Sequence, residues 1–338
     1  MTSSQMTLRN ESHSGTIAWL TNRLGPWPRF LLKRLASLFV VLAMLLVLTF
    51  LLIYLVPGDP AVRKAGIDAS AEQIEFERKA LGLDQPAHIQ FIRYIEGVAR
   101  LDFGTSFITK QSVTEILQQR FPRTFQLAGT GLLIVMTVSV PLGILVGALT
   151  REGRNRRLEV VFMSVTSTSS AMPEFLTATF LAFIFAVTLN WLPVGTTQKS
   201  TAIILPAISV SLRPVASLAR VVRLETLNVL AQDYIRTARS KRLPAYLIFM
   251  RHLLPNVLTA ALTIGGLVFA GLLGGTVIVE NVFAWPGLGQ RVVDAVFNLD
   301  YPVIQGIVLY FGMIVVLINT AVDILLALVD PRTLVLSE

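Results

Sequence analysis

Six long apolar segments constrain this chain more than any other feature of its sequence. They lie at about Leu35–Val56, Thr124–Leu149, Leu158–Leu192, Ile203–Val222, Leu253–Val279 and Val303–Val329. A helix needs about 20 predominantly apolar residues to cross the hydrocarbon core of a bilayer. Hydrophobic residues make up 53% of the 338 residues, whereas charged residues make up only 15%. We therefore expect an all-α membrane protein with six transmembrane helices rather than a soluble domain.

Basic residues gather in alternate loops between these segments. The short loop 151–157 holds four arginines and one glutamate, and residues 220–251 hold seven basic and two acidic side chains. The long loop 57–123 instead balances nine basic against nine acidic residues. Because short loops rich in lysine and arginine stay in the cytoplasm, we expect both termini and residues 223–252 there. The same pattern makes 57–123 a large external loop.

This charge pattern divides the chain into a transmembrane domain at residues 29–332, a polar cytoplasmic tail at 1–28 and a short tail at 333–338. A signal peptide is the competing interpretation of the first apolar segment. That segment is longer than the apolar region of a typical signal peptide, and no small-residue cleavage site follows it. We therefore expect a retained first span.

The external loop carries two predicted amphipathic helices, Ser70–Leu81 and Ile89–Arg100. We expect them to form a small external cap, with Asp59, Asp84 and Asp102 as its candidate site residues. A structural lid without substrate contact and a substrate-binding role both fit this loop.

Two features inside the apolar segments predict departures from simple spanning helices. Threonine, serine and proline at residues 167–173 predict a broken helix, which is tolerated only where protein or a water-filled cavity covers the backbone. In the fifth segment, glycines give one helix face small side chains: Gly265, Gly266, Gly271, Gly274 and Gly275. We expect this face to pack closely against another helix, and favour that interpretation over a hinge.

Charged residues in or beside the spans predict a translocation pathway. Arg213 is seven residues from both Pro206 and Arg220, which places it roughly 10 Å from either marker and near mid-membrane. A charge there costs roughly 2.5–3.5 kcal/mol on insertion scales, so it should face a cavity or a partner. The candidate pathway residues are Arg213, which would attract a carboxylate, together with Glu280 and Asp323. A structural ion pair between Arg213 and Asp323 is the alternative.

A polar, basic stretch from Asp233 to Asn256 separates the fourth and fifth segments. Its first part, Asp233–Leu243, is predicted to be a short helix that Asp233 caps and that ends before Pro244. Four cations make this helix strongly basic: Arg236, Arg239, Lys241 and Arg242. A helix this short is marginal alone, so we expect another surface to hold it. A solvated basic loop beside the membrane is the alternative.

This stretch resembles the cytoplasmic coupling segment in permease subunits of ABC importers, specifically the dipeptide, oligopeptide and nickel branch. The resemblance rests on DYIRTARSK at 233–241, on Arg251 and His252, and on Asn256. Further matching strings follow in the family's order: PGDP at 57–60, LGLDQP at 81–86, DFGTS at 102–106, ENVFAWPGLG at 280–289 and DYP at 300–302. At two positions where the family usually has glycine, this chain has Leu101 and Arg242.

The resemblance implies a membrane-spanning permease that translocates dipeptides or oligopeptides across the bacterial cytoplasmic membrane. The implied partners are a second homologous permease, two ATPase subunits that carry ATP and Mg²⁺, and an external substrate-binding protein. In this family the short helix docks into a groove on the ATPase, which implies the coupling residues Asp233, Tyr234, Arg236, Thr237, Ala238, Arg239, Lys241 and Arg242. A nickel-chelate or other small-solute permease of the same branch is an alternative. A self-sufficient channel or secondary transporter is another.

The sequence argues against chemistry of the chain's own. It has no cysteine, which excludes disulfides and thiolate metal sites, and its histidines at 13, 88 and 252 are too scattered to predict a metal site. No P-loop or hydrolase motif is present. We therefore expect no catalytic residue, no metal or cofactor bound directly and no ATPase activity. The distribution of basic residues favours a role in topology over nucleic-acid binding.

Overall fold

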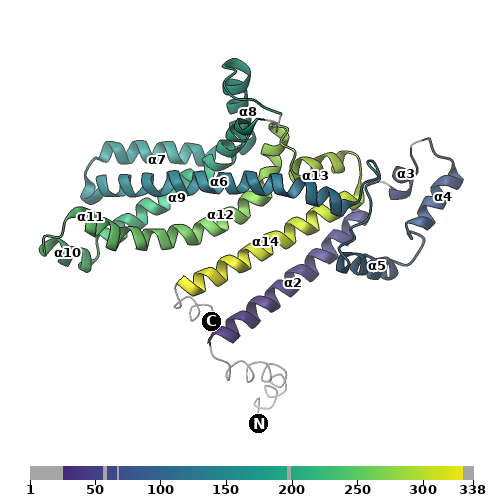
Figure 1. The fold of residues 1–338 in the computed structure, drawn as a ribbon, viewed down its shortest axis with the longest axis horizontal. Coiled ribbons are helices and arrows are strands. Elements are labelled where there is room, and N and C mark those ends of the chain that lie inside the picture. The colour runs from purple at the N-terminus through teal and green to yellow at the C-terminus, as the bar shows by residue number, and fades with distance from the viewer. Residues whose placement is uncertain (1–25, 56–58, 67, 196–198, 330–338) are drawn as a thin grey trace, which may run out of the picture.

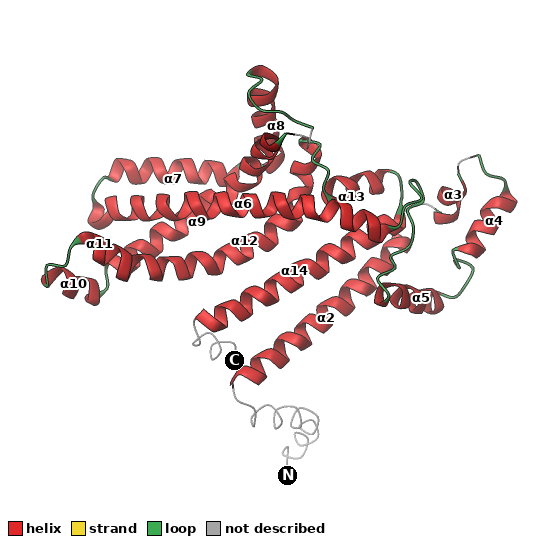
Figure 2. Cartoon of the chain, viewed as in Figure 1, coloured by secondary structure: helices red, strands yellow, loops and turns green. Residues whose placement is uncertain are grey.

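The computed structural model describes residues 26–55, 59–66, 68–195 and 199–329. These residues form helices and loops without a β-strand (Figure 1, Figure 2). An isolated bridge between Thr105 and Ser112 is the one strand-like pairing in this part of the chain. Most of the predicted N-terminal tail and all of the predicted C-terminal tail lie outside the described residues.

Five described helices are long and apolar enough to cross a membrane. They are α2 Pro26–Leu55, α6 Val113–Leu149, α9 Ile204–Leu230, α12 Leu254–Val282 and α14 Tyr301–Val329. Five of the six predicted apolar spans are therefore confirmed as single helices.

The sixth predicted span is a bent pair of helices. α7 (Arg156–Ala171) meets α8 (Glu174–Leu181), which continues as a π-helix at Ala182–Thr188, at an angle of 99°. Pro173 has no N–H with which to continue the hydrogen bonds of α7, and Met172 before it is extended, with ψ 129°. The predicted break is therefore confirmed, and the pair makes a sixth span only if its two arms cross the membrane together.

The core of the bundle consists of α6, α9 and α12, which pack side by side (Figure 1). A Cβ at Gly143 of α6 would lie 2.6 Å from Val222, and one at Gly147 would lie 2.8 Å from Thr226. These distances leave no room for a side chain, so glycine permits the close approach of α6 and α9. The buried apolar residues between the three helices include Leu127, Val135, Leu205, Leu218, Val257 and Leu273.

α2 and α14 lie side by side and antiparallel at one edge of the bundle (Figure 1). Near the start of α2, Arg34 forms an ion pair of 2.8 Å with Asp323 near the end of α14. At the opposite end of the pair, the Gln305 amide donates a hydrogen bond of 2.9 Å to the Thr49 carbonyl. The first and last described helices therefore hold the two ends of the described chain together.

The predicted external loop contains three short helices, α3 Pro60–Ala65, α4 Ala71–Ala80 and α5 Ala87–Ala99. Ser70 and Gln73 form a reciprocal capping box at the start of α4. Both predicted amphipathic helices are thus present as α4 and α5. Together the three helices form a cap beside the ends of α2 and α14 at one extremity of the molecule (Figure 1).

The loop ends earlier than predicted, because α6 begins at Val113 and not at Thr124. Pro122 lies inside α6, although a proline within a helix costs about 3 kcal/mol or more. Packing outweighs this cost, since Val113, Ile116 and Leu117 are buried against α14 and the short helix before it. Tertiary contacts therefore extend the second span into the predicted loop.

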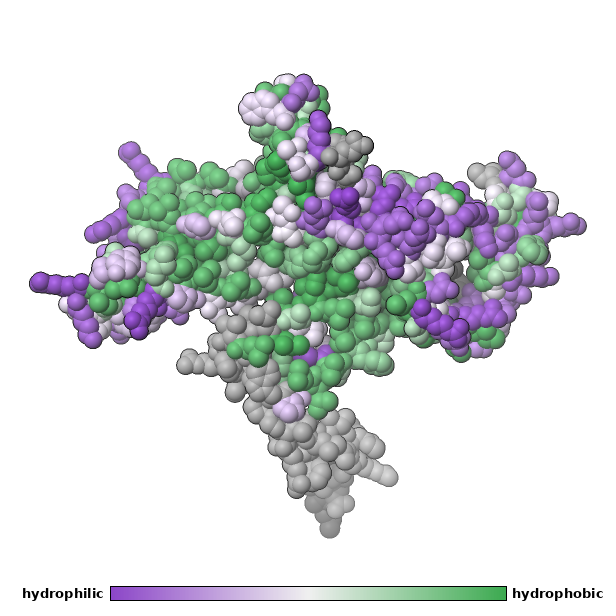
Figure 3. Space-filling view, in the orientation of Figure 1, coloured by the Kyte–Doolittle hydropathy of each residue, from purple (hydrophilic) through white to green (hydrophobic). Residues whose placement is uncertain are grey.

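The opposite extremity carries α10 Asp233–Ser240, α11 Ala245–Ile248 and a π-helix at Phe249–Leu253, which together connect α9 to α12. Hydrophilic side chains gather at this extremity, over the cap and around α13 (Leu288–Phe297) beside the cap, and the face between these two ends is largely apolar (Figure 3). This distribution suits a helix bundle whose middle lies in hydrocarbon and whose ends lie in water.

Candidate coupling and transport sites

The predicted coupling helix α10 is anchored by two apolar side chains three residues apart. Ile235 is fully buried and Ala238 is 5% exposed. Both pack against Ile248 of α11 and Leu230 at the end of α9. Residues at i and i+3 share one face of a helix, so a narrow stripe attaches α10 to the bundle and leaves the rest of its surface open.

The open surface of α10 and the turn after it is polar and cationic. Its exposed members of the predicted coupling set are Asp233, Tyr234, Arg236, Thr237, Arg239, Lys241 and Arg242. The Arg236 side chain is 82% exposed and lies 3.9 Å from the carboxylate of Asp233, which is 96% exposed. Ion pairs this exposed contribute little to stability, so the charges of α10 are available to a partner. Ala238 is the one predicted coupling residue that faces inward.

Asp233 begins α10 but does not cap it, contrary to the prediction. Gln232 occupies the N-cap position in an extended conformation, and its side chain makes no cap hydrogen bond. Asp233 instead lies in the first turn, where the partial positive charge of the helix N-terminus favours a carboxylate. Charge therefore stabilises this end of α10 in place of a side-chain cap.

α10 ends at Ser240 rather than at Leu243, and a left-handed turn follows it. Arg242 has a φ of +55°, and its N–H donates to the Arg239 carbonyl at 2.8 Å. The Leu243 N–H donates to the Ala238 carbonyl at 3.2 Å. These two hydrogen bonds form a Schellman motif, whose left-handed position most often holds glycine. The backbone conformation thus explains why glycine suits the position that Arg242 occupies.

A cavity of about 400 Å³ lies between α10, the end of α9 and the turn after α6. Its lining residues are Arg151, Glu152, Leu227, Leu230, Ala231, Gln232, Ile235, Arg236 and Arg239. Three arginines against one glutamate give this lining a net charge of +2. Arg151 pairs with Glu152, so Arg236 and Arg239 provide the excess positive charge.

Exposed apolar side chains, which the sequence analysis did not single out, flank this basic surface. Tyr246 of α11 is 66% exposed, Met250 of the π-helix is 58% exposed, and Leu243 is also exposed. The ring of Tyr234 lies near that of His252, with centroids 6.0 Å apart. Aromatic, methionine and arginine side chains are enriched at protein interfaces. The sequence feature that could have indicated these exposed apolar side chains is the apolar run that directly follows the basic helix.

Arg213 lines a second cavity, of about 260 Å³, where the bent α7–α8 pair meets α9 and α12. Its lining residues are Glu174, Val210, Arg213, Pro214, Ser217, Val268, Gly271, Leu272 and Gly275. Arg213 and Glu174 interact electrostatically, but among the described residues no ion pair within 4.0 Å joins them. Glu174 was not among the predicted site residues, although an acid directly after the proline of a predicted break was a visible signal.

Asp323 takes no part in this cavity. Its carboxylate pairs with Arg34 of α2, so the alternative pairing of Arg213 with Asp323 is not formed. The prediction considered only charges within the spans that it compared and overlooked the cation at the start of the first span. Asp323 therefore links α14 to α2, and Arg213 belongs to a different part of the bundle.

Glu280 lies at the end of α12 in a closed hydrogen-bond network. It is fully buried, and its carboxylate accepts from the Thr124 hydroxyl at 2.7 Å and from the Gln290 N–H at 3.1 Å. The Thr124 hydroxyl accepts in turn from the Leu288 N–H at 2.8 Å. The network ties α6 and α12 to α13 (Leu288–Phe297) and holds the carboxylate away from any substrate in this conformation.

The small face of α12 has a packed half and an open half. A Cβ at Gly265 would lie 3.0 Å from the Met136 sulfur, and one at Gly266 would collide with Val322. At three further glycines, no atom of the described residues lies within 4 Å of an added Cβ: Gly271, Gly274 and Gly275. The predicted close packing is therefore confirmed within the chain for the first pair, whereas at the other three glycines α12 borders open space in the single chain.

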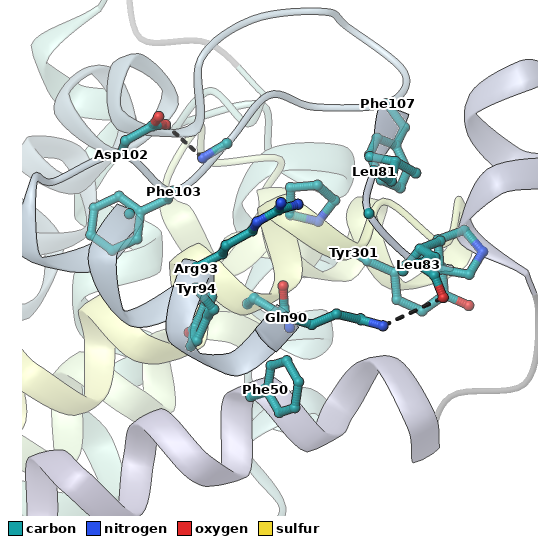
Figure 4. A pocket seen from close by; sticks show the side chains of 16 residues that line it. Phe50, Leu81, Leu83, Gln90, Arg93, Tyr94, Asp102, Phe103, Phe107 and Tyr301 are labelled. Atoms are coloured by element: carbon teal, nitrogen blue, oxygen red, sulfur yellow. Dashed lines mark hydrogen bonds between the residues drawn. The ribbon is translucent and has the colours of Figure 1, made fainter. Parts of the chain in front are cut away.

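A third cavity, of about 310 Å³, lies where the cap meets α2 and α14 (Figure 4). The rings of Phe50, Tyr94 and Phe103 line it together with the side chain of Arg93. The Tyr94 hydroxyl forms a hydrogen bond of 2.9 Å with that of Thr49. Burial raises the pKa of Tyr94 above its usual value, and the hydrogen bond to Thr49 only partly opposes this. The cap therefore meets the bundle through an aromatic contact with a neutral phenol.

The three predicted cap carboxylates do not share a site. Asp102 borders the cavity, and its carboxylate accepts from a backbone N–H two residues on. Asp59 caps α3 by accepting from the Ala61 N–H at 2.9 Å, and it pairs with Arg78 at 2.5 Å. Asp84 is exposed and does not line the cavity. The structure therefore gives Asp59 a structural role within the cap.

Comparisons with known proteins agree with these features. Residues 139–335 match the family described as a binding-protein-dependent transport system inner membrane component, and residues 28–128 match the model of its N-terminal region. A protein of Brucella suis named as a peptide transport system permease is 38% identical over 310 residues, which covers 89% of this chain and 98% of the relative. A glutathione transport system permease protein of Salmonella paratyphi A is 40% identical over 302 residues, covering 89% and 97%.

The fold is also similar to that of a solved structure, the MetNI methionine ABC transporter in an inward-facing conformation. The TM-score is 0.53 at 18% sequence identity, and the match covers 64% of this chain and 96% of that chain. A likeness at this identity supports the fold alone. The family model spans more than half of the chain, and the relatives match almost end to end. This chain belongs to the family of binding-protein-dependent transport system inner membrane components, and it is a multi-pass protein of the bacterial inner membrane.

Proposed function

We propose that this chain is the membrane-spanning permease subunit of an ATP-driven importer of dipeptides or oligopeptides. The observation that carries the proposal is α10, a short helix with exposed cations that two side chains attach to the end of an apolar bundle. The relatives named as peptide and glutathione permeases support peptides as the substrate class. Because the chain has no P-loop, the energy comes from ATP and Mg²⁺ bound to separate ATPase subunits.

The proposed topology has six spans, with the bent α7–α8 pair as the third. α10 and the basic turn after α6 lie at one extremity of the bundle, and the cap lies at the other (Figure 1). Short basic loops stay in the cytoplasm, so α10 faces the cytoplasm and the cap faces outward. The ion pair between Arg34 and Asp323 holds the first and last spans together, which suits two termini on the cytoplasmic side.

In this proposal α10 docks into a groove on an ATPase subunit. Its exposed arginines bind acidic side chains of that subunit, and the exposed Tyr246 and Met250 add apolar contacts. The basic cavity beside α10 receives a side chain of the partner. Movement of the ATPases on binding ATP then moves α10, and the Schellman turn after α10 passes this movement to α11 and α12.

The remaining partners complete the pathway. A second, homologous permease subunit lies against the open face of the bundle, and the two permeases line the path between them. An external substrate-binding protein delivers the peptide at the cap. Arg213 faces this path, whereas Glu280 and Asp323 stabilise the bundle through the contacts described above.

Co-purification in mild detergent tests the proposal directly. The chain should bring down two ATPase subunits and a second permease, and the reconstituted complex should accumulate peptides in vesicles with binding protein and ATP. A chain that moves peptides without any ATPase subunit would be a self-sufficient transporter, and the proposal would be wrong.

Thiol labelling tests the topology on a chain that has no native cysteine. Asp84→Cys and Thr109→Cys, at exposed positions of the predicted external loop, should react with an impermeant reagent added outside intact cells. Ser240→Cys, at the exposed end of α10, should react only after the membrane is opened. Labelling of Ser240→Cys from outside would invert the proposed topology.

A further inference from the structure

We infer that the cavity beside Arg213 binds both charged ends of a small peptide, with Arg213 taking the carboxylate and Glu174 taking the ammonium group. The inference rests on the proposed function and deepens it, because it names what the permease itself recognises in its substrate. It adds Glu174 to the pathway as a specificity-determining residue.

The three arginines of α9 differ in their contacts, because two of them have partners on α7 and one does not. Arg220 donates to the Ser170 hydroxyl at 3.0 Å, and Arg223 pairs with Glu159 at 2.5 Å. Arg213 makes no hydrogen bond or ion pair with the residues that the structure describes. α7 ends before the level of Arg213, so the side chain faces a cavity where its neighbours along α9 face a helix.

The break in the third span places an acid on the same cavity. Glu174 is the first residue of α8, directly after the bend, and it lines the cavity together with Arg213. The two side chains are near enough to interact but do not form an ion pair within 4.0 Å. Charged groups inside a membrane protein are costly and usually mark a substrate path. Two opposite charges held apart leave each one free to bind the opposite charge of a ligand.

α12 lines the cavity with two glycines as well as with the side chains of Val268 and Leu272. Gly271 and Gly275 lie one turn apart on α12, and neither would bring an added Cβ within 4 Å of another atom. A hydroxyl from Ser217 completes the polar part of the lining. The volume of about 260 Å³ is close to the lower end of small-molecule sites, roughly 300 Å³. The site therefore suits a small zwitterion whose uncharged middle contacts Gly271 and Gly275.

Protection of an introduced thiol tests occupancy of the cavity in the assembled transporter. Gly275→Cys should react with a small thiol reagent in the detergent-purified complex, and a dipeptide such as Ala-Ala should slow that reaction about tenfold at saturation. Gly274→Cys is the matched control, because it lies one residue away in equally open space but outside the lining. Its reaction should be insensitive to the dipeptide.

End-capped dipeptides then assign the two charges. N-acetylation and C-amidation should each weaken protection about tenfold, as for loss of a hydrogen bond to a charged group. In Glu174→Gln, N-acetylation should have no further effect while C-amidation still weakens protection. In Arg213→Gln the pattern should be reversed. Such coupling between residue and peptide end identifies a direct contact.

Three outcomes would overturn the inference. They are the absence of protection by any peptide, equal protection by free and doubly capped peptides, and equal loss for both ends in both variants, which would mark a purely structural charge pair. Transport of Ala-Ala by the unlabelled wild-type complex is measured in parallel. If the complex transports the dipeptide without protecting Gly275→Cys, the site is wrong and the proposed function stands. If it transports no peptide, the proposed function itself fails.

Discussion

The two ends of α12 are held in opposite ways. In the proposed topology, the end of α12 that follows α10 and α11 is its inner end, and the end before α13 is its outer end. At the inner end, α10 and α11 attach to the bundle through Ile235 and Ala238, and all their charged side chains are exposed. At its outer end, the fully buried Glu280 joins three helices through its hydrogen bonds. Nearby, the fully buried carboxylate of Asp300 accepts from Ser106 at 2.5 Å and from Arg291 at 3.3 Å.

This difference distinguishes a docking element, α10 with α11, from a rigid region around Glu280 that we call the frame. A buried polar network that is fully hydrogen-bonded makes a region rigid, because any rearrangement exposes unpaired groups. An element held by a few apolar contacts opens at low free energy and can follow a partner. The outer end is therefore suited to hold the spans in register, and the inner end is suited to receive movement from another subunit.

Loss of the outer network should have the largest effect. Glu280→Ala removes the acceptor for Thr124 and Gln290 and leaves a void between α6, α12 and α13. We expect a loss of about 3 kcal/mol in unfolding free energy, since buried donors are left unpaired. The measurement is thermal unfolding of the purified complex in detergent.

Glu280→Gln separates a structural role from a pathway role. The amide retains an oxygen acceptor for the Thr124 hydroxyl, so this variant should keep most of the stability that Glu280→Ala loses. Transport should follow stability in both variants. If Glu280→Gln unfolds like the wild type but does not transport, Glu280 has a role in the translocation pathway. The outer end of α12 would then not be purely structural.

A smaller effect is expected when the anchor of α10 is weakened. Ile235→Ala removes part of the fully buried side chain that holds α10 against α11, and should cost about 2 kcal/mol of local stability. Amide exchange should accelerate in α10 and α11 while the amides of α12 beyond Gly265 remain protected. Faster exchange throughout α12 would show that the inner end is part of the frame.

Reversal of the exposed charges should affect coupling without affecting stability. Arg236→Glu with Arg239→Glu removes the excess positive charge beside α10, and should reduce transport about tenfold by weakening ATPase docking. Arg236→Lys with Arg239→Lys is the charge-retaining control. Unchanged ATPase recruitment and transport in the reversed variant would remove the docking role of α10.

Much of this architecture follows from patterns that a linear sequence displays. Apolar length predicts the spans, and the Thr, Ser and Pro cluster predicts the 99° break. The partners of charged groups cannot be predicted from such patterns, because Asp323 forms an ion pair with Arg34, almost 300 residues away in the sequence. Pro122 was also misleading, since buried contacts of α6 and not local propensity decide where that helix begins.

Helix ends were predicted least well, for a related reason. Asp233 has the residue type of a cap, but the cap position itself belongs to Gln232. Both positions where this chain departs from the family's usual glycine have left-handed backbone, with φ of +55° at Arg242 and +59° at Leu101. At both positions the chain adopts a left-handed conformation without glycine and bears its steric cost.

We expect the smallest effects from glycine substitutions in these two turns. Leu101 follows α5 at the cap, where the Asp102 N–H donates to the Gly97 carbonyl at 2.9 Å and completes the same motif as that after α10. A left-handed conformation costs a residue with a side chain about 1 kcal/mol relative to glycine. Leu101→Gly and Arg242→Gly should therefore each slow local amide exchange, in α5 and α10 respectively, by a factor of about five.

The two variants should differ in function although they are matched in backbone chemistry. Stabilising the turn at Leu101 affects only the cap, so transport should stay within about twofold of the wild type. Stabilising the turn at Arg242 also removes a cation from the docking surface, and glycine has no side chain to bind the ATPase. If Arg242→Ala lowers transport and Arg242→Gly does not, a more stable left-handed turn compensates for the lost guanidinium; if both lower it equally, the guanidinium alone limits coupling. Either result assigns Arg242 a role at the inner end that Leu101 does not have in the cap, whereas full transport by both Arg242 variants would show that neither feature limits coupling.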